Sequence, residues 1–260
     1  SVNITDCFVI VKEPSLAYDN KAVSDVDAEK KRLAEALDKC IAKTQAMADD
    51  MKERVGEKEA EILEGHVLLL MDPEMTGQME TSIADDKMCA EAAVEKICDY
   101  YMQMFSSIDD EMFQQRATDV CDIKTRLLKI LLDVEDVDLA NVPEGTVLVA
   151  EDLTPSMTAG INPKNVTGIL TEVGGKTSHS AILARALEIP AVLSIPGITE
   201  KISNGDKVVL DGSEGQTYIN PDEKLQAEYE QTMKNIASYE DILNNYDSMA
   251  EVIMEELDSY

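Results

Sequence analysis

The sequence predicts an α/β domain into which a helical bundle is inserted, followed by a long C-terminal helix. Two changes of hydrophobic period lead to this prediction. A short apolar run near the N-terminus gives way at about residue 24 to helical spacing, which continues to about residue 133. After residue 143 the pattern becomes that of an α/β unit, with short apolar runs separated by glycine and proline.

The first element is expected to be a buried strand at Cys7–Lys12, where the residues form a short continuous apolar run. Amphipathic helices follow, and Ser24 is expected to cap the first of them. Their apolar stripes begin at Leu33, Ile62, Met75, Ala93 and Phe113. Helices with such short breaks are typical of an up-and-down bundle.

The α/β unit is expected to contain one short helix at Ser180–Leu187 and several strands. The strands are expected at Thr146–Ala150, Val166–Thr171, Ala191–Ser194, Lys207–Leu210 and Gln216–Ile219. If the N-terminal strand joins this sheet, the bundle is an insertion. The chain then divides into an α/β domain (1–22 and 143–222), a helical subdomain (23–142) and a C-terminal linker helix (223–260).

The composition indicates an acidic cytoplasmic protein. The formal net charge is −29, which argues against nucleic-acid binding because phosphates would be repelled, and favours a basic protein partner. The five cysteines show no CxxC spacing, so neither a disulfide framework nor a zinc site is expected. The sequence shows neither a membrane span nor a signal peptide, so we expect no membrane partner.

Residues 174–185, Gly-Gly-Lys-Thr-Ser-His-Ser-Ala-Ile-Leu-Ala-Arg, contain the strongest functional signal. An imidazole with a pKa near neutrality is a competent nucleophile. The glycines before His179 would let a phosphate approach the backbone, and the helix after it would direct N–H groups at the anion. A lone histidine behind a serine more often caps a helix. This setting instead favours a histidine that carries a phosphoryl group.

The run resembles the phosphohistidine signature of the phosphoenolpyruvate-utilising enzymes at Gly174, Gly175, Thr177 and His179 through Arg185. Over nearly the whole chain, the order of strand, inserted bundle, histidine loop and long helix resembles the amino-terminal half of Enzyme I. That family belongs to the bacterial phosphoenolpyruvate-dependent sugar phosphotransferase system. Further similar stretches are Glu64–His66, Arg116 to Ile123 with the leucines after it, Asp152–Thr158 and Tyr218–Pro221.

The resemblance implies a phosphotransferase swivelling domain in which Nε2 of His179 takes a phosphoryl group from phosphoenolpyruvate. His179 would pass it to the phosphocarrier protein HPr, which docks on the helical bundle, in sugar uptake. Thr158 would hold the other ring nitrogen. Positioning and electrostatics dominate phosphoryl transfer, so the loop residues are expected to contribute. The expected contributors are Gly174, Gly175, Lys176, Thr177, Ser178 and Arg185, although Arg185 more often anchors such a helix through a salt bridge.

The docking surface is expected near the second and third helices. A methionine-rich stretch around Pro73 either docks HPr or fills the bundle core, and the sequence leaves both interpretations open. For His66 a semi-buried, satisfied histidine is favoured over a partner contact. The residues expected on the docking side are Glu57, His66, Leu69, Glu74, Met75, Met79 and Arg116.

The resemblance also implies what this chain lacks. The barrel that binds phosphoenolpyruvate and Mg²⁺ in Enzyme I lies beyond it, so no cofactor is expected here. The chain should exchange phosphate with HPr only, associate with that C-terminal domain, and be monomeric alone. Two alternatives remain. One is the phosphohistidine domain of a dikinase or phosphoenolpyruvate synthase, which lacks such a bundle, and the other is a non-catalytic scaffold that binds HPr.

Overall fold

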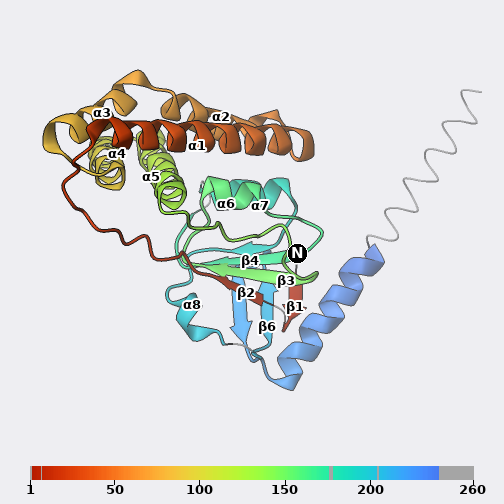
Figure 1. The fold of residues 1–260 in the computed structure, drawn as a ribbon. Helices are drawn as coiled ribbons and strands as arrows, with labels where there is room; N and C mark the ends of the chain where they lie inside the picture. The colour runs from red at the N-terminus through yellow and green to blue at the C-terminus, as the bar shows by residue number, and fades with distance from the viewer. Residues whose placement is uncertain (1, 7, 176–177, 204, 240–260) are drawn as a thin grey trace, which may run out of the picture.

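The computed structural model describes residues 2–6, 8–175, 178–203 and 205–239. A layer of long helices lies over an α/β unit, and a further helix at residues 223–239 runs along the side of that unit (Figure 1). The long helices form the bundle that the hydrophobic period predicted. They are α1 (Val26–Arg54), α2 (Glu57–Leu70), α3 (Pro73–Asp86), α4 (Ala90–Ser106) and α5 (Glu111–Leu131).

Side-chain caps determine where several of these helices begin. Asp25, and not the expected Ser24, caps α1 by accepting a hydrogen bond from the backbone N–H of Ala28. Asp72 and Asp110 cap α3 and α5 in the same way. A capping carboxylate satisfies a free N–H and complements the positive end of the helix dipole. The aspartates therefore specify the breaks between helices.

The α/β unit contains two sheets. One is parallel, with strand order β2 (Phe8–Val11), β3 (Thr146–Ala150), β4 (Val166–Thr171) and β5 (Ala191–Val192). The other is antiparallel, with order β1 (Val2–Thr5), β6 (Val208–Asp211) and β7 (Gln216–Ile219). The pairing of β2 with β3 confirms that the N-terminal segment joins the sheet across the inserted bundle.

The single N-terminal strand expected at Cys7–Lys12 is corrected to two strands in different sheets. An exposed bend at Asp6 separates β1, which pairs with β6, from β2, which pairs with β3. β1 is only half-buried and alternates apolar with polar residues, so it gave no continuous apolar run. Cys7 itself lies outside the described residues.

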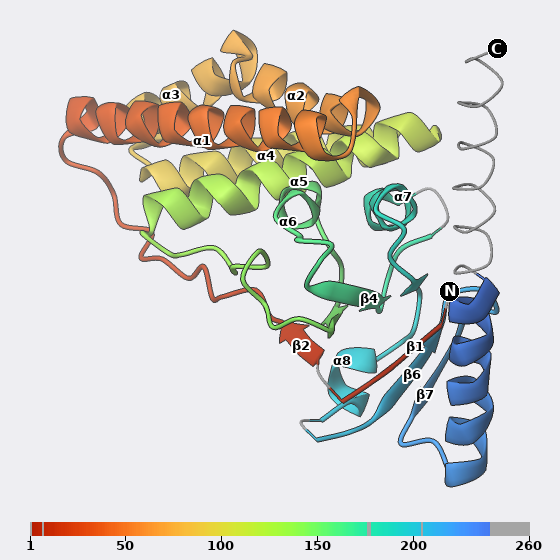
Figure 2. The same ribbon diagram turned by 90° about the vertical axis from the view of Figure 1, so that its right-hand side faces the viewer.

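The parallel sheet is covered on both faces. Val147, Val149 and Leu170 pack against the antiparallel sheet and α8 (Ile198–Lys201). Its other face, including Leu148 and Ile169, packs under α6 (Pro155–Ala159) and α7 (His179–Ala186). These two helices lie between the sheet and the bundle in both views (Figures 1 and 2). This arrangement places the N-terminus of α7 at the junction of the two layers.

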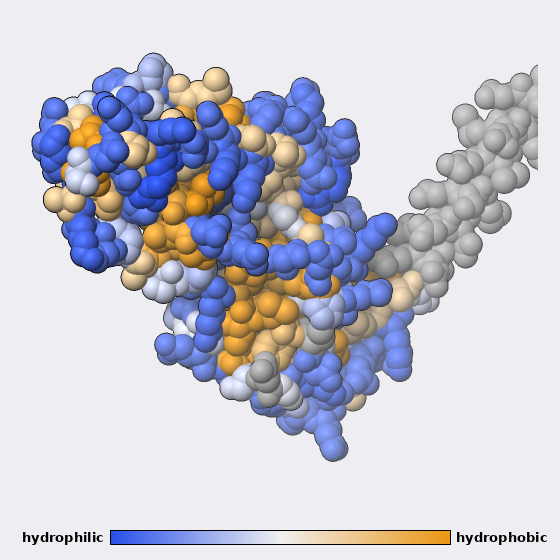
Figure 3. Space-filling view, viewed as in Figure 1, coloured by the Kyte–Doolittle hydropathy of each residue, from blue (hydrophilic) through white to orange (hydrophobic). Residues whose placement is uncertain are grey.

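Apolar side chains and hydrogen bonds join the bundle to the α/β unit. Met51 of α1 and Leu63 of α2 pack with Leu183 of α7 in one buried cluster. Arg54 donates to the carbonyl oxygen of Ala159 at 2.6 Å, which closes an end of α6. Figure 3 shows apolar residues gathered between the two layers, while most of this face is hydrophilic. No helix of the described part is long and apolar enough to cross a membrane.

Candidate functional site

His179 is the first residue of α7, one position earlier than the sequence predicted. Ser178 caps the helix by accepting from the backbone N–H of Ala181 at 3.3 Å. Gly174 has φ of 115°, a conformation that disfavours any residue with a Cβ. The loop therefore turns sharply before the helix, and the helix N-terminus directs its free N–H groups toward the space beside the histidine.

The imidazole of His179 is directed into the junction between α7 and the bundle, where its side chain is 11 % exposed. Its Nε2 lies 3.8 Å from Oδ1 of Asp119 on α5. A cavity of only 20 Å³ adjoins the ring, and its lining includes Met51, Leu63 and Thr158. The ring is thus enclosed by mainly apolar side chains on one side and by a carboxylate on the other.

A second histidine, His66 of α2, lies behind the same carboxylate and is fully buried. Its Nε2 is 3.1 Å from Oδ1 of Asp119, and its Nδ1 is 3.0 Å from Nη2 of Arg126. Arginine has only donors, so Nδ1 accepts and the ring proton is on Nε2, which donates to Asp119. Thr44 of α1 completes the chain by accepting from Arg126 at 2.6 Å.

Asp122, one turn along α5 from Asp119, connects this network to the α/β unit. Its carboxylate accepts from the backbone N–H of Ser156 at 2.9 Å and from the Ser156 hydroxyl at 2.6 Å. It also lies 3.7 Å from Nε of Arg126. Asp122 is 2 % exposed. The helix α6 is therefore tied to α5 by a partly buried, charge-assisted pair of hydrogen bonds.

Burial lowers the pKa of His179 from its ordinary value of 6.5, because the charged imidazolium is poorly solvated at the junction. The neighbouring carboxylate of Asp119 opposes this effect, and the nearby His66 adds to it. Partial desolvation raises the pKa of Asp152, whose charge favours protonated His179. The balance favours the neutral ring, which is the nucleophilic form.

The structure brings Gly174, Ser178 and Thr158 close to His179. Thr158 is buried on α6 and donates its hydroxyl proton to the carbonyl oxygen of Pro155 at 2.8 Å. Gly175 accepts from the Ser178 hydroxyl at 2.8 Å. Arg185 is exposed in the last turn of α7. The predicted contributors Lys176 and Thr177 lie outside the described residues.

The expected docking residues separate into buried and exposed sets. Met75, Met79 and His66 are at most 2 % exposed and belong to the interior, in agreement with the interpretations of His66 as a satisfied histidine and of the methionines as core residues, so their place among the docking residues is corrected. Met75 and Met79 lie four residues apart on the face of α3 that meets the bundle core. Leu69 is partly buried against the same core. The remaining members, Glu57, Glu74 and Arg116, lie at the surface.

Other apolar side chains are exposed on the bundle. Leu68 is 72 % exposed, Met71 61 % and Met112 63 %. Met104 and Ile108 are each 37 % exposed. Single exposed apolar residues are ordinary, and a functional meaning requires that such residues act together. We call Leu68, Met71, Met104, Ile108 and Met112 the exposed apolar set.

The sequence motifs do not identify Asp119, Asp122, Arg126 or Thr44 as site residues. Asp119 and Asp122 lie within one of the stretches that resemble Enzyme I. A signal was present, because the charged residues 119, 122 and 126 follow the i, i+3, i+7 spacing of one helical face. That face lies beside the apolar stripe of Val120, Ile123 and Leu127, and a charge carried into the interior there has to be paired.

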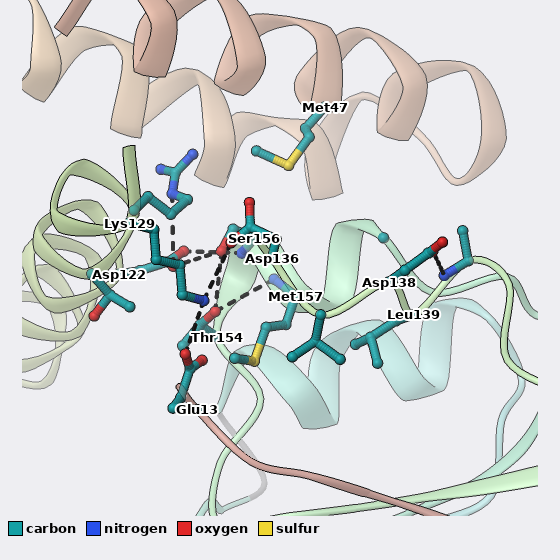
Figure 4. Close-up of a pocket in the computed structure, with 15 residues that line it drawn as sticks. Glu13, Met47, Asp122, Lys129, Asp136, Asp138, Leu139, Thr154, Ser156 and Met157 are labelled. Carbon is teal, nitrogen blue, oxygen red and sulfur yellow. Dashed lines mark hydrogen bonds and ion pairs between the residues drawn. The ribbon is translucent and has the colours of Figure 1, made fainter. Parts of the chain in front are cut away.

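A larger cavity of 180 Å³ lies beside the network, between α5, α6 and the segments that connect bundle and sheet (Figure 4). Within it Lys129 contacts Glu13 at 2.8 Å and Asp136 at 3.2 Å, so one ammonium joins both connecting segments. His179 does not line this cavity. Within residues 2–239, apart from the undescribed gaps, no cluster of His, Cys, Asp or Glu is suited to a metal ion.

Comparison with known families assigns this architecture to the phosphoenolpyruvate-utilising enzymes. Residues 2–116 match the family described as "PEP-utilising enzyme, N-terminal" and residues 142–215 match "PEP-utilising enzyme, mobile domain". The solution structure of an Enzyme I protein (nEIt) superposes with a TM-score of 0.76 at 33 % identity. It covers 91 % of this chain and 96 % of that one. The chain belongs to the Enzyme I family, of which it represents the N-terminal part.

Curated relatives carry the name phosphoenolpyruvate-protein phosphotransferase. The protein from Listeria innocua is 40 % identical over 236 residues, and that from Enterococcus faecalis is 39 % identical over 237 residues. Each comparison covers 91 % of this chain and 41 % of the relative. The chain thus spans less than half the length of these relatives. The N-terminal domain of "Enzyme 1 - Nitrogen" shares the fold, with a TM-score of 0.57 at 23 % identity.

Proposed function

We propose that His179 accepts a phosphoryl group on Nε2 and passes it to the phosphocarrier protein HPr. The observation that carries this proposal is the site itself: an imidazole favoured in its neutral form, at the N-terminus of α7. The relatives with about 40 % identity are named phosphoenolpyruvate-protein phosphotransferases, which supports the same reaction class. Loop N–H groups and the helix dipole would stabilise the added negative charge.

The transfer requires an unprotonated Nε2. The Nε2 lone pair attacks phosphorus as the bond to the donor breaks, so an N–P bond forms on His179 while the donor takes the bonding electron pair. Thr158 gives its own proton to Pro155, so its oxygen can only accept from the ring. Accepting from Nδ1–H would fix the tautomer with Nε2 free. We assign Thr158 this orienting role.

The phosphoenolpyruvate-binding part belongs, in this proposal, to the region of the relatives that the chain does not span. Any Mg²⁺ would bind there with phosphoenolpyruvate. The exposed apolar set supports HPr docking on the bundle, with acidic residues such as Glu74 facing a basic partner. A role in sugar uptake, a cytoplasmic location and a monomeric state complete the proposal.

The test is transfer of acid-labile phosphate from phosphorylated HPr. The wild-type chain should acquire label and His179→Ala should not. His66→Gln should still become labelled, because His66 is buried with both ring nitrogens bonded. Binding of HPr by titration without any label on the wild type would contradict the phosphoryl carrier and favour an HPr-binding scaffold.

A further inference from the structure

We propose that His66 is a positioning residue for His179: it holds Asp119 in place, close to the His179 ring but not bonded to it, and so keeps Nε2 of that ring available. This inference rests on the proposed role of His179 as nucleophile. His66 does not touch the reacting atoms, and it acts only through the carboxylate that lies between the two rings.

The orientation of His66 is determined by its partners. Arg126 donates to Nδ1, so a ring turned the other way would set an N–H against that guanidinium. The proton therefore stays on Nε2, directed at Oδ1 of Asp119 at 3.1 Å. Arg126 is held in turn by Thr44. With no exposed surface, His66 has one satisfied arrangement.

The Asp119 carboxylate is therefore hydrogen-bonded to His66 but not to His179. The same Oδ1 that accepts from His66 lies 3.8 Å from Nε2 of His179, too far for a hydrogen bond but near enough to stabilise the ring electrostatically when it is protonated. Its Oδ2 is 3.4 Å from Arg116. Without the donor from His66, the carboxylate would be free to bond Nε2–H of His179 directly. That bond would stabilise the protonated ring and occupy the nucleophilic atom.

Two other carboxylates near His179 have their own partners. Asp122 accepts from Ser156 and lies beside Arg126. Asp152 accepts from the backbone N–H of Leu153. Within the described part of the chain, Asp119 is the one carboxylate within 4.0 Å of a His179 ring nitrogen. The protonation of His179 should therefore depend on Asp119 more than on its other acidic neighbours.

The experiment is a pH titration of histidine-labelled protein by NMR, which is direct because the chain has two histidines. His66→Leu should move the His179 titration to higher pH than in the wild type. His66→Gln should restore it, because the amide oxygen can accept from Arg126 and the amide nitrogen can donate to Asp119. Asp119→Asn should move the titration to lower pH. Phosphoryl exchange at neutral pH should slow in His66→Leu in proportion to the lost neutral fraction.

A folded His66→Leu protein whose His179 titrates as in the wild type would overturn the proposal and leave His66 a purely structural residue. If His66→Leu does not fold, the Asp119→Asn variant provides the test. A His179 titration in Asp119→Asn at the same pH as in the wild type also overturns the proposal. These titrations need no phosphoryl donor. A failure of the proposed phosphotransfer would therefore show as absent labelling, separately from the shifts.

Discussion

At the residue scale, His179 combines burial with a nearby carboxylate, and these two influences oppose one another. Burial disfavours the imidazolium, while Asp119 favours it. Because burial is the larger influence, the folded protein binds a proton at His179 less readily than the unfolded chain does. This difference links the stability of the junction to pH.

The sign of that linkage gives the first prediction. A histidine with a lowered pKa contributes stability that is complete above its ordinary value of 6.5 and is lost as pH falls through the folded-state value. The free energy of unfolding, measured in urea, should therefore fall more for the wild type than for His179→Gln as the pH drops below 6.5. Comparing the two proteins cancels the titration of the many carboxylates. A difference independent of pH would contradict this linkage.

Thr158 is the subject of a second prediction at this scale. Thr158→Val keeps the shape but removes the oxygen that we propose accepts from Nδ1–H of His179. The ring should then populate both neutral tautomers, and phosphoryl exchange should slow about tenfold, the equivalent of one net hydrogen bond. Ring ¹⁵N chemical shifts report the tautomer directly. Thr199→Val, in the short helix α8 away from His179, is the matched control. Unchanged ¹⁵N shifts in Thr158→Val would exclude the orienting role.

At the scale of elements, the contact between α5 and α6 depends on one buried carboxylate. Asp122→Ala would leave Arg126 uncompensated at 6 % exposure and would free the hydrogen-bonding groups of Ser156. Removing one partner of a buried pair costs about 3 kcal/mol or more. We expect chemical denaturation to show a loss of this size.

The control for this prediction is another aspartate paired with a base. Asp99 contacts Lys124 at 2.7 Å, but its side chain is 55 % exposed. Asp99→Ala should change the unfolding free energy by less than about 1 kcal/mol, because exposed ion pairs contribute little. Equal losses in the two variants would show that burial is not what makes the Asp122 contact strong.

The elements that were predicted from sequence are those with enough residues to show a period. The strands β3, β4 and β7 have the expected bounds, and the long helices follow their apolar stripes. The short helices α6 and α8 were not anticipated, since five and four residues are too few for helical periodicity. β5 is also shorter than expected, ending at Val192.

The candidate site was predictable only where its residues are close in sequence. The loop from Gly174 to His179 is one contiguous motif, so it was found. The polar network joins residues that are 53 to 82 positions apart, such as His66 with Asp119 and Thr44 with Arg126. Only the packing of α1, α2 and α5 brings them together, and no local pattern encodes that packing. The burial of Met75 and Met79 was undetermined for the same reason.

At the scale of the whole molecule, a net charge of −29 is combined with the exposed apolar set on the bundle, where we propose that HPr docks. Such a field accelerates encounter with a basic partner without adding contacts, and salt weakens it. The exposed apolar set would then determine how long the complex lasts, because dissociation depends mainly on the close contacts. The effect of charge on the association rate and the effect of the exposed apolar set on the dissociation rate should therefore be measurable separately.

The fourth prediction tests that separation with HPr. Raising ionic strength from low to physiological should reduce the association rate constant about tenfold or more, with a smaller change in dissociation. Met71→Ala should raise the dissociation rate and leave the salt dependence of association intact. Glu74→Gln, in the first turn of α3 close to Met71, should slow association more than Glu214→Gln, which removes an exposed charge in the α/β unit. Stopped-flow association at several salt concentrations measures all three. Equal effects of the two glutamate variants would mean that only the total charge guides HPr, and that this surface of the bundle is not where it docks.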